Sequence, residues 1–140
     1  MPTKTKLIIV DDVLMVRLGL SQMLRKVDTI EIIAEADNGQ AFLDKLSIHK
    51  PDVVLMDIKM PIMDGLEATK KALNKFPGLK IIALTADSNE SAIEEMVLSG
   101  AKGFLLKSVG IAELQKAIET VLGGSTYYSN ELVTAYKLKK

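Results

Sequence analysis

The 140-residue chain contains no cysteine and no tryptophan, and it has a single histidine. The lack of cysteine excludes disulfides, thiolate metal sites and thiol nucleophiles. His49 has no second histidine with which to share a metal ion. The first apolar run spans only residues 7–10, so neither a signal peptide nor a membrane span fits. We therefore expect a soluble, cytoplasmic protein.

The chain also lacks an excess of charge of either sign. Eighteen basic residues balance eighteen acidic ones, which argues against a general binder of nucleic acid. Hydrophobic residues make up 48% of the sequence and charged residues 26%, as is typical of globular proteins. The length fits one domain.

Five short apolar runs recur along the chain. They lack the polar alternation of a half-exposed sheet, so they predict strands that are covered on both faces. Glu31 and Glu35 flank the second run, which suits an edge strand. The runs are residues 7–10, 32–34, 53–56, 81–84 and 104–106.

Apolar residues at three-to-four spacing lie between these runs and predict five helices. Five strands alternating with five helices indicate an α/β, three-layer α-β-α sandwich around a parallel sheet. This pattern fits the flavodoxin-like doubly wound fold, from which we adopt the strand order 2-1-3-4-5. Residues 1–123 form the predicted domain. Residues 124–140 begin with a helix-breaking Gly-Ser pair and form a predicted linker or tail with helical spacing at 132–136.

Chemically active side chains follow four of the strands. Asp11 and Asp12 follow the first run, Asp57 the third, Thr85 the fourth and Lys107 the fifth. In open α/β sheets, ligands bind beyond the carboxyl ends of the strands. Because these four strands are neighbours in the predicted order, we expect the five side chains to converge.

Three carboxylates at close range raise one another's pKa unless a cation holds them. A divalent metal together with Lys107 would balance their charge. All-oxygen ligands without histidine or cysteine favour Mg²⁺ or Mn²⁺ over zinc. A carboxylate can also attack phosphorus to form an aspartyl-phosphate. Lys107, Thr85 and backbone N–H groups after Asp57 would then stabilise the transferring phosphoryl group.

These residues resemble the receiver domain of bacterial two-component response regulators over residues 5–122. The matching segments are residues 11–12 (DD), 57–65 (DIKMPIMDG), 85–86 (TA) and 104–107 (FLLK). Further segments resemble the LuxR/NarL type of regulator. They are residues 17–20 (RLGL), 100–107 (GAKGFLLK) and 123–128 (GGSTYY).

The resemblance implies a phosphoprotein switch rather than a multiple-turnover enzyme. Asp57 would be the phospho-acceptor, and Lys107 would pair with a phosphoryl oxygen. Asp11, Asp12, Asp57 and the backbone carbonyl of Lys59 would hold Mg²⁺ or Mn²⁺.

Thr85 and Phe104 would form the switch pair of the family, although an aromatic residue in a strand is also simply a core residue. Ser108 departs from the proline that often follows the family's lysine, where the peptide bond is cis. Simpler roles also exist for three residues. Asp12 and Thr85 could cap the first and fourth helices, and Asp64 suits a helix start.

The implied partners are a histidine kinase or a phosphotransfer protein, and a second copy of the chain upon phosphorylation. We expect no membrane contact and no direct DNA contact by this chain. In LuxR/NarL regulators, a helix-turn-helix domain follows the receiver and regulates transcription. A stand-alone receiver and a phosphorylation-independent docking module are alternatives.

Two other functional classes fit less well. An aspartyl-phosphate phosphatase needs an Asp-x-Asp after its first strand, and an FMN carrier needs a phosphate loop there without carboxylates.

Overall fold

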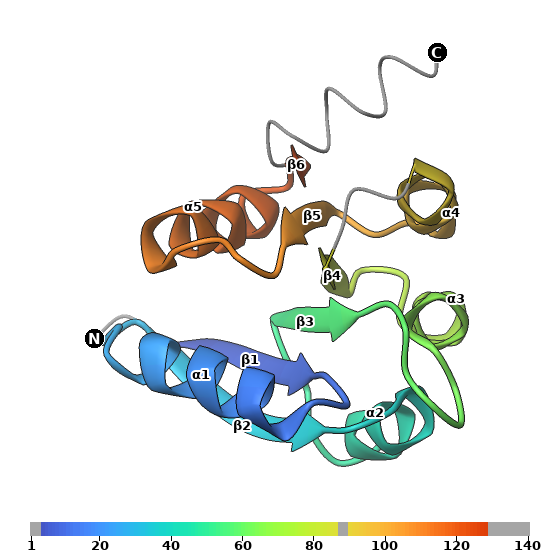
Figure 1. Cartoon of the computed structure of the whole chain (residues 1–140), viewed down its shortest axis with the longest axis horizontal. Helices are drawn as coiled ribbons and strands as arrows, with labels where there is room; N and C mark the ends of the chain where they lie inside the picture. The colour runs from blue at the N-terminus through green and yellow to red at the C-terminus, as the bar shows by residue number, and fades with distance from the viewer. Residues whose placement is uncertain (1–3, 87–89, 129–140) are drawn as a thin grey trace.

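The computed structural model describes residues 4–86 and 90–128, which form one sheet between two layers of helices (Figure 1). The strands are β1 (Thr5–Val10), β2 (Ile30–Ala36), β3 (Val53–Asp57), β4 (Lys80–Thr85), β5 (Gly103–Leu106) and β6 (Tyr127–Tyr128). The helices are α1 (Leu14–Arg25), α2 (Gly39–Leu46), α3 (Gly65–Lys75), α4 (Glu90–Ser99) and α5 (Ile111–Leu122).

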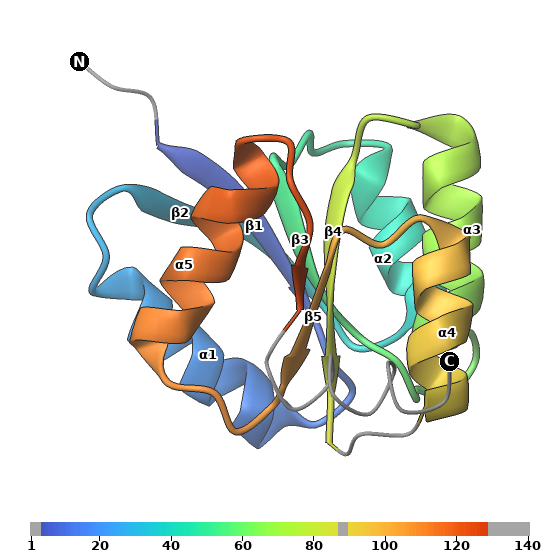
Figure 2. The same ribbon diagram turned by 90° about the horizontal axis from the view of Figure 1, so that it is seen from above.

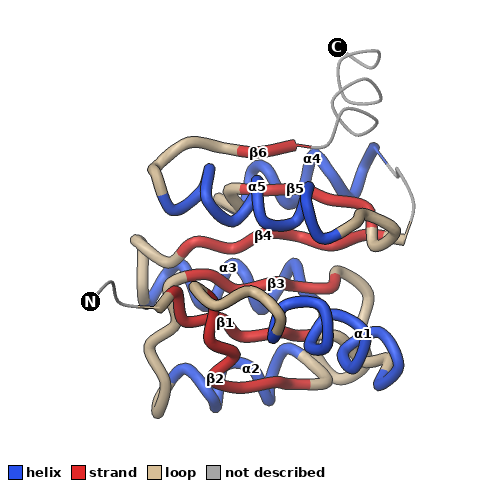
Figure 3. The backbone as a smooth tube through the Cα atoms, turned by 90° about the vertical axis from the view of Figure 1, so that its left-hand side faces the viewer, coloured by secondary structure: helices blue, strands red, loops and turns tan. Residues whose placement is uncertain are grey.

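All strand pairs are parallel. The sheet order is β2-β1-β3-β4-β5-β6, and Figure 3 shows this order from one side. The predicted fold class, the order of the first five strands and the edge position of β2 are confirmed. The sheet gains a sixth strand, β6, whose Tyr127 pairs with Gly103 of β5. β6 lies in the segment predicted as linker, so the sheet extends past residue 123. The helix predicted at 132–136 lies outside the described residues.

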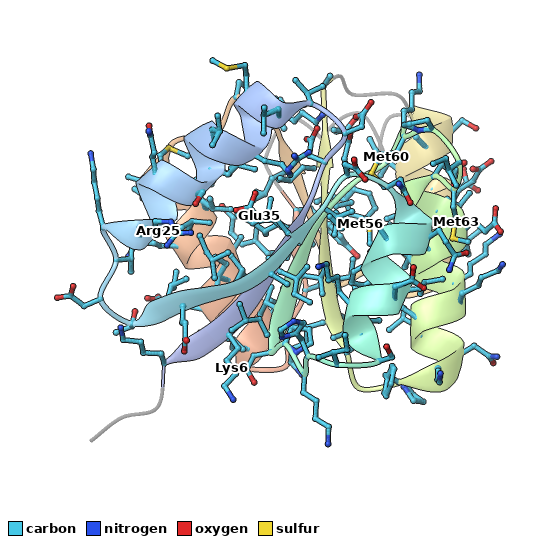
Figure 4. All side chains as sticks on the ribbon, turned by 90° about the horizontal axis from the view of Figure 1, so that it is seen from below. Lys6, Arg25, Glu35, Met56, Met60 and Met63 are labelled. Carbon is cyan, nitrogen blue, oxygen red and sulfur yellow. The ribbon has the colours of Figure 1, made fainter. Side chains whose placement is uncertain are left out.

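The helices cover the two faces of the sheet as a doubly wound fold requires. α1 and α5 lie on one face, and α2, α3 and α4 lie on the other (Figure 2). Residues of β1 alternate between the two sides: Leu7 and Ile9 pack with α1 and α5, whereas Ile8 and Val10 pack with α2 and α3. The side chain of Met56 in β3 packs on the face of the sheet that α2, α3 and α4 cover, between the sheet and α2 (Figure 4).

Two of the helices, α2 and α3, begin at residues whose side chains cap them. Asn38 accepts a hydrogen bond from the N–H of Ala41 at the start of α2, and Asp64 accepts one from Glu67 at the start of α3. The helix start predicted at Asp64 is thereby confirmed. Across residues 4–86 and 90–128, no helix has the length and apolar character that crossing a membrane requires.

Candidate functional site

The carboxyl ends of β1 and β3 place two aspartates side by side in the interior. Asp11 is fully buried directly after β1, and Asp57, the last residue of β3, is 4% exposed. Asp12 follows on the exposed side of the same turn. Each of the three residues offers a carboxylate oxygen, and these atoms lie within 4.8 Å of one another. The structure therefore brings together three acids that are 46 positions apart in the sequence at most.

Lys107, directly after β5, supplies the positive charge of the site. Its Nζ lies 2.9 Å from Asp11 Oδ2 and 3.0 Å from Asp57 Oδ1. Its backbone N–H donates to the carbonyl of Thr85, at 2.8 Å, and this bond joins the ends of β4 and β5. The ammonium group thus pairs with both buried carboxylates. The backbone hydrogen bond to Thr85 fixes the position of the Lys107 main chain.

The loop after Asp57 is folded tightly against the aspartate. The N–H of Ile58 donates to Asp57 Oδ1 at 2.9 Å, and the N–H of Gly65 donates to the carbonyl of Ile58 at 2.7 Å. A Cβ atom on Gly65 would lie 2.0 Å from the carbonyl oxygen of Asp57. Only glycine allows this approach of α3 to β3, which closes the loop beneath the carboxylate.

The environment shifts the proton affinity of both partners. Burial raises the pKa of Asp57 to about 6, the charge of Asp11 and the contact with Asp12 add to the rise, and Lys107 opposes it. Burial by itself would lower the pKa of Lys107. The hydrogen bonds and charges of Asp11 and Asp57 outweigh burial and raise that pKa. The lysine is therefore firmly protonated, whereas ionised Asp57 is held at a cost.

The donor set fits a hard divalent cation. Asp11 Oδ2 is buried, and among the described residues its one partner is the ammonium group of Lys107. One ammonium group faces three carboxylates, so the cluster lacks positive charge. Carboxylate oxygens without nitrogen or sulfur ligands are the donors that Mg²⁺ and Mn²⁺ prefer.

A small cavity of about 110 Å³ opens beside Asp57. Its lining residues are Asp57, Ile58, Lys59, Thr85, Ala86, Ala92 and Lys107. A larger groove of about 850 Å³ lies at the opposite end of the strands, where Asp52 precedes β3 and Lys80 begins β4. That groove is remote from the acidic cluster, so the smaller cavity is the candidate site.

The remaining predicted residues take different positions. Thr85 is 8% exposed at the end of β4, and Lys59 is exposed where it lines the cavity. Phe104 is fully buried in β5, with its ring centroid 5.5 Å from that of Tyr128. This is a core position, and the switch role of Phe104 and the carbonyl ligand of Lys59 stay predictions.

The capping role considered for Asp12 is wrong. The N-cap of α1 is Val13, which makes no side-chain cap. Asp11 Oδ1 instead accepts the N–H of Val13 at 2.9 Å. The corresponding cap considered for Thr85 concerns residues 87–89, which lie outside the described part. The described peptide bonds, including that between Lys107 and Ser108, are not cis.

Sequence reasoning missed one residue that touches the site. Arg17 of α1 donates from Nη1 to the backbone carbonyl of Asp11 at 2.5 Å. In the sequence, Arg17 stands out only as part of the RLGL segment that resembles LuxR/NarL regulators. A helical residue six positions after Asp11 shows no sequence pattern that predicts a contact with it.

Comparison with known proteins bears directly on this site. Residues 7–119 match the family described as the response regulator receiver domain. The chain is 39% identical over 134 residues to the response regulator GacA of Pseudomonas syringae pv. syringae. That match covers 96% of the chain and 63% of GacA, so the chain spans less than two thirds of this relative.

Two solved structures are similar over nearly their whole length. A LuxR-family two-component response regulator from Aurantimonas sp. SI85-9A1 aligns with a TM-score of 0.92, at 26% identity, over 98% of each chain. The signal receiver domain of NarL from Mycobacterium tuberculosis aligns with a TM-score of 0.82, at 30% identity, over 88% of this chain and 99% of that one. The aspartates at the ends of β1 and β3 and the lysine after β5 therefore lie in a receiver domain, and the chain belongs to the two-component response regulators of the LuxR/NarL type.

Proposed function

We propose that Asp57 accepts a phosphoryl group from a histidine kinase or a phosphotransfer protein, and that this modification switches the receiver between two states. The observation that carries the proposal is the position of Asp57. Its buried carboxylate borders a cavity of about 110 Å³ and lies 3.0 Å from Lys107 Nζ. A carboxylate beside a cationic donor and a small polar cavity is equipped for phosphoryl transfer.

The transfer is a displacement at phosphorus. An oxygen of ionised Asp57 forms a bond to phosphorus while the bond from phosphorus to the donor's imidazole nitrogen breaks, and that nitrogen keeps the electron pair. Lys107 remains protonated and offers its ammonium group to a phosphoryl oxygen. Thr85, which lines the same cavity, would donate its hydroxyl to a second oxygen.

We propose that Asp11, Asp12, Asp57 and the carbonyl of Lys59 hold Mg²⁺ or, alternatively, Mn²⁺. When bound, the cation offsets the negative charge that gathers on the phosphoryl oxygens. The protein's own part is to hold the carboxylates in place. Asp11 is fixed by Lys107 and by the N–H of Val13, and the N–H of Ile58 orients Asp57.

The output belongs to the same proposal. The modification adds a group with a charge of about −1.5 to −2, by analogy with other phosphorylated residues. Thr85 would move toward this charge, and the face formed by α4, β5 and α5 would change its affinity for a second copy of the chain. In a LuxR/NarL regulator such a change would control transcription through a helix-turn-helix domain. We expect this switch to work in the cytoplasm without multiple turnover of a substrate.

The direct test is phosphorylation by acetyl phosphate with Mg²⁺, followed by intact mass spectrometry. The wild type should gain one phosphoryl group, and Asp57→Asn should gain none. Asp52→Asn is a matched control, because Asp52 precedes the opposite end of the same strand and is exposed. This control should be phosphorylated like the wild type. Equal labelling of Asp57→Asn, or no labelling of the wild type, would refute the proposal.

A further inference from the structure

Arg17 bridges the end of β1 to the neighbouring strand β2. Its Nη1 donates to the backbone oxygen of Asp11 at 2.5 Å, and its Nε lies 3.4 Å from Glu35 Oε1. The side chains of Arg17 and Glu35 are 15% and 33% exposed. Glu35 projects from β2 on the side of α1 (Figure 4). A guanidinium group this far from solvent needs such partners, and its planar fork lets it reach two of them at once.

The hydrogen bond from Arg17 completes the anchoring of Asp11. The N–H of Asp11 donates to the carbonyl of Ala36, Oδ1 accepts from Val13, and Oδ2 pairs with Lys107. The carbonyl that Arg17 contacts belongs to the peptide unit that joins Asp11 to Asp12. Arg17 therefore fixes the orientation of the peptide plane from which Asp12 departs.

Asp12 depends on this backbone anchor more than the other two acids do. Asp11 and Asp57 are buried, and each is held by Lys107, whereas Asp12 is exposed. The turn also lacks an ordinary capping side chain, because Val13 at the N-cap of α1 provides none. Apart from its contact with Asp57, the direction of the Asp12 carboxylate is therefore set by the backbone of the turn.

We infer that Arg17 is a positioning residue for the cation site of Asp11, Asp12 and Asp57, and that Glu35 holds Arg17 in its working orientation. This inference rests on the proposed function, since it concerns the cation that the proposal assigns to the three acids. Residues that orient metal ligands without touching the metal contribute strongly to metal affinity in other proteins.

The positive charge of Arg17 lets an experiment distinguish a positioning role from a purely electrostatic effect on cation binding. Removing a positive charge beside a cation site strengthens cation binding if charge alone acts. Removing a positioning residue weakens it. The two explanations thus predict changes of opposite sign in the dissociation constant of Mg²⁺.

The experiment is a Mg²⁺ titration of the metal-free chain at constant ionic strength, followed by amide chemical shifts in NMR spectra. Arg17→Gln should weaken Mg²⁺ binding about tenfold. Arg17→Lys should lose less, because an ammonium group can still donate to the carbonyl of Asp11 but cannot also reach Glu35. Glu35→Gln should show an intermediate loss. Arg25→Gln is the control, since Arg25 lies in the same helix and bonds to Ser21 Oγ instead.

Each outcome decides the matter. Binding by Arg17→Gln that equals or exceeds wild-type affinity overturns the inference. If this variant does not fold, as shown by circular dichroism, Arg17→Lys carries the test because it keeps the positive charge, and unchanged Mg²⁺ affinity in Arg17→Lys overturns the inference. A wild type that binds no Mg²⁺ refutes the proposed cation site itself, which separates that failure from a failure of the role of Arg17.

Discussion

Lys107 Nζ lies 3.0 Å from Asp57 Oδ1, although Asp57 ends β3, Lys107 follows β5, and β4 lies between these two strands in the sheet. The lysine extends across the end of β4 and pairs with Asp11 as well. Removing one partner of a buried ionic group is costly, because the remaining charges lose their compensation.

Lys107→Met should therefore destabilise the metal-free protein by about 1–3 kcal/mol at neutral pH. The pKa of Asp57 should rise further, because the main opposing influence on it is gone. Urea unfolding in the presence of a chelator measures the loss. Lys102→Met is the control, since Lys102 is exposed before β5. Equal stability of the Lys107 variant and the wild type would show that the ion pairs contribute nothing net.

The raised pKa of Asp57 predicts that this residue contributes to the free energy of unfolding in a pH-dependent way. The rise from 3.8 to about 6 corresponds to about 3 kcal/mol of unfavourable ionisation in the folded state. The folded protein binds the proton more tightly than the unfolded chain, so this contribution favours folding below pH 3.8. It is lost as the pH rises through about 6.

Asp57→Asn should accordingly be more stable than the wild type at pH 8 without metal, by about 1–3 kcal/mol. The gain should shrink between pH 6 and pH 4, and saturating Mg²⁺ should reduce it by stabilising the wild type. Denaturant unfolding across this pH range is the measurement. Asp52→Asn, at an exposed position just before β3, should give no comparable gain. A constant difference from pH 4 to pH 8 would contradict the shifted pKa of Asp57.

Much of this site could be predicted because two strong signals coincide. Buried parallel strands appear as unbroken apolar runs, and the first polar residue after a run marks the sheet edge where ligands bind. Asp57 and Lys107 follow directly from that rule. The rule does not predict β6, because a two-residue strand such as Tyr127–Tyr128 has no periodicity. Its pairing depends on where the chain returns to the sheet after α5. Arg17 was missed because its hydrogen bond to the carbonyl of Asp11 depends on the orientation of a side chain in α1 and leaves no pattern in the sequence.

The close approach of α3 to β3 predicts that Gly65 tolerates no side chain. The Cβ of alanine would lie 2.0 Å from the carbonyl oxygen of Asp57 and 3.0 Å from Ile58 Cα, so the backbone itself must move. Gly65→Ala should lower the free energy of unfolding by about 3 kcal/mol, at the upper end of overpacking costs. It should also impair phosphorylation of Asp57.

Gly19→Ala is the control, and we expect it to change the free energy of unfolding in the opposite direction from Gly65→Ala. Gly19 lies inside α1, and nothing lies within 4 Å of a Cβ placed there. Alanine in the interior of an exposed helix should raise the free energy of unfolding by about 0.5–1 kcal/mol. Thermal or urea unfolding of both variants gives the comparison. A neutral Gly65→Ala would mean that the loop beneath Asp57 has room that the structure does not show.

The loop between β3 and α3 contains a second constraint, at Ile62. This residue has a φ of 68°, and its neighbours form a hydrogen bond from the N–H of Met63 to the carbonyl of Pro61 at 2.7 Å. A turn of this kind with positive φ is strained, and a β-branched side chain adds to the strain. Met63 cannot relax easily, because its carbonyl accepts the N–H of Gly39 at 2.8 Å. Ile62 is 82% exposed, so no buried contact offsets the strain.

Ile62→Gly should therefore raise the free energy of unfolding by about 1 kcal/mol, because relief of strain exceeds the entropy that glycine adds to the unfolded chain. Ile48→Gly provides the matched control. Ile48 is 77% exposed in a turn after α2 and, unlike Ile62, is not at positive φ. There glycine brings only its entropic cost, and stability should fall by about 0.5–1 kcal/mol. Urea unfolding of both variants at one pH measures the two signs, and a loss of stability in Ile62→Gly as large as that in Ile48→Gly would show that the turn stores no strain.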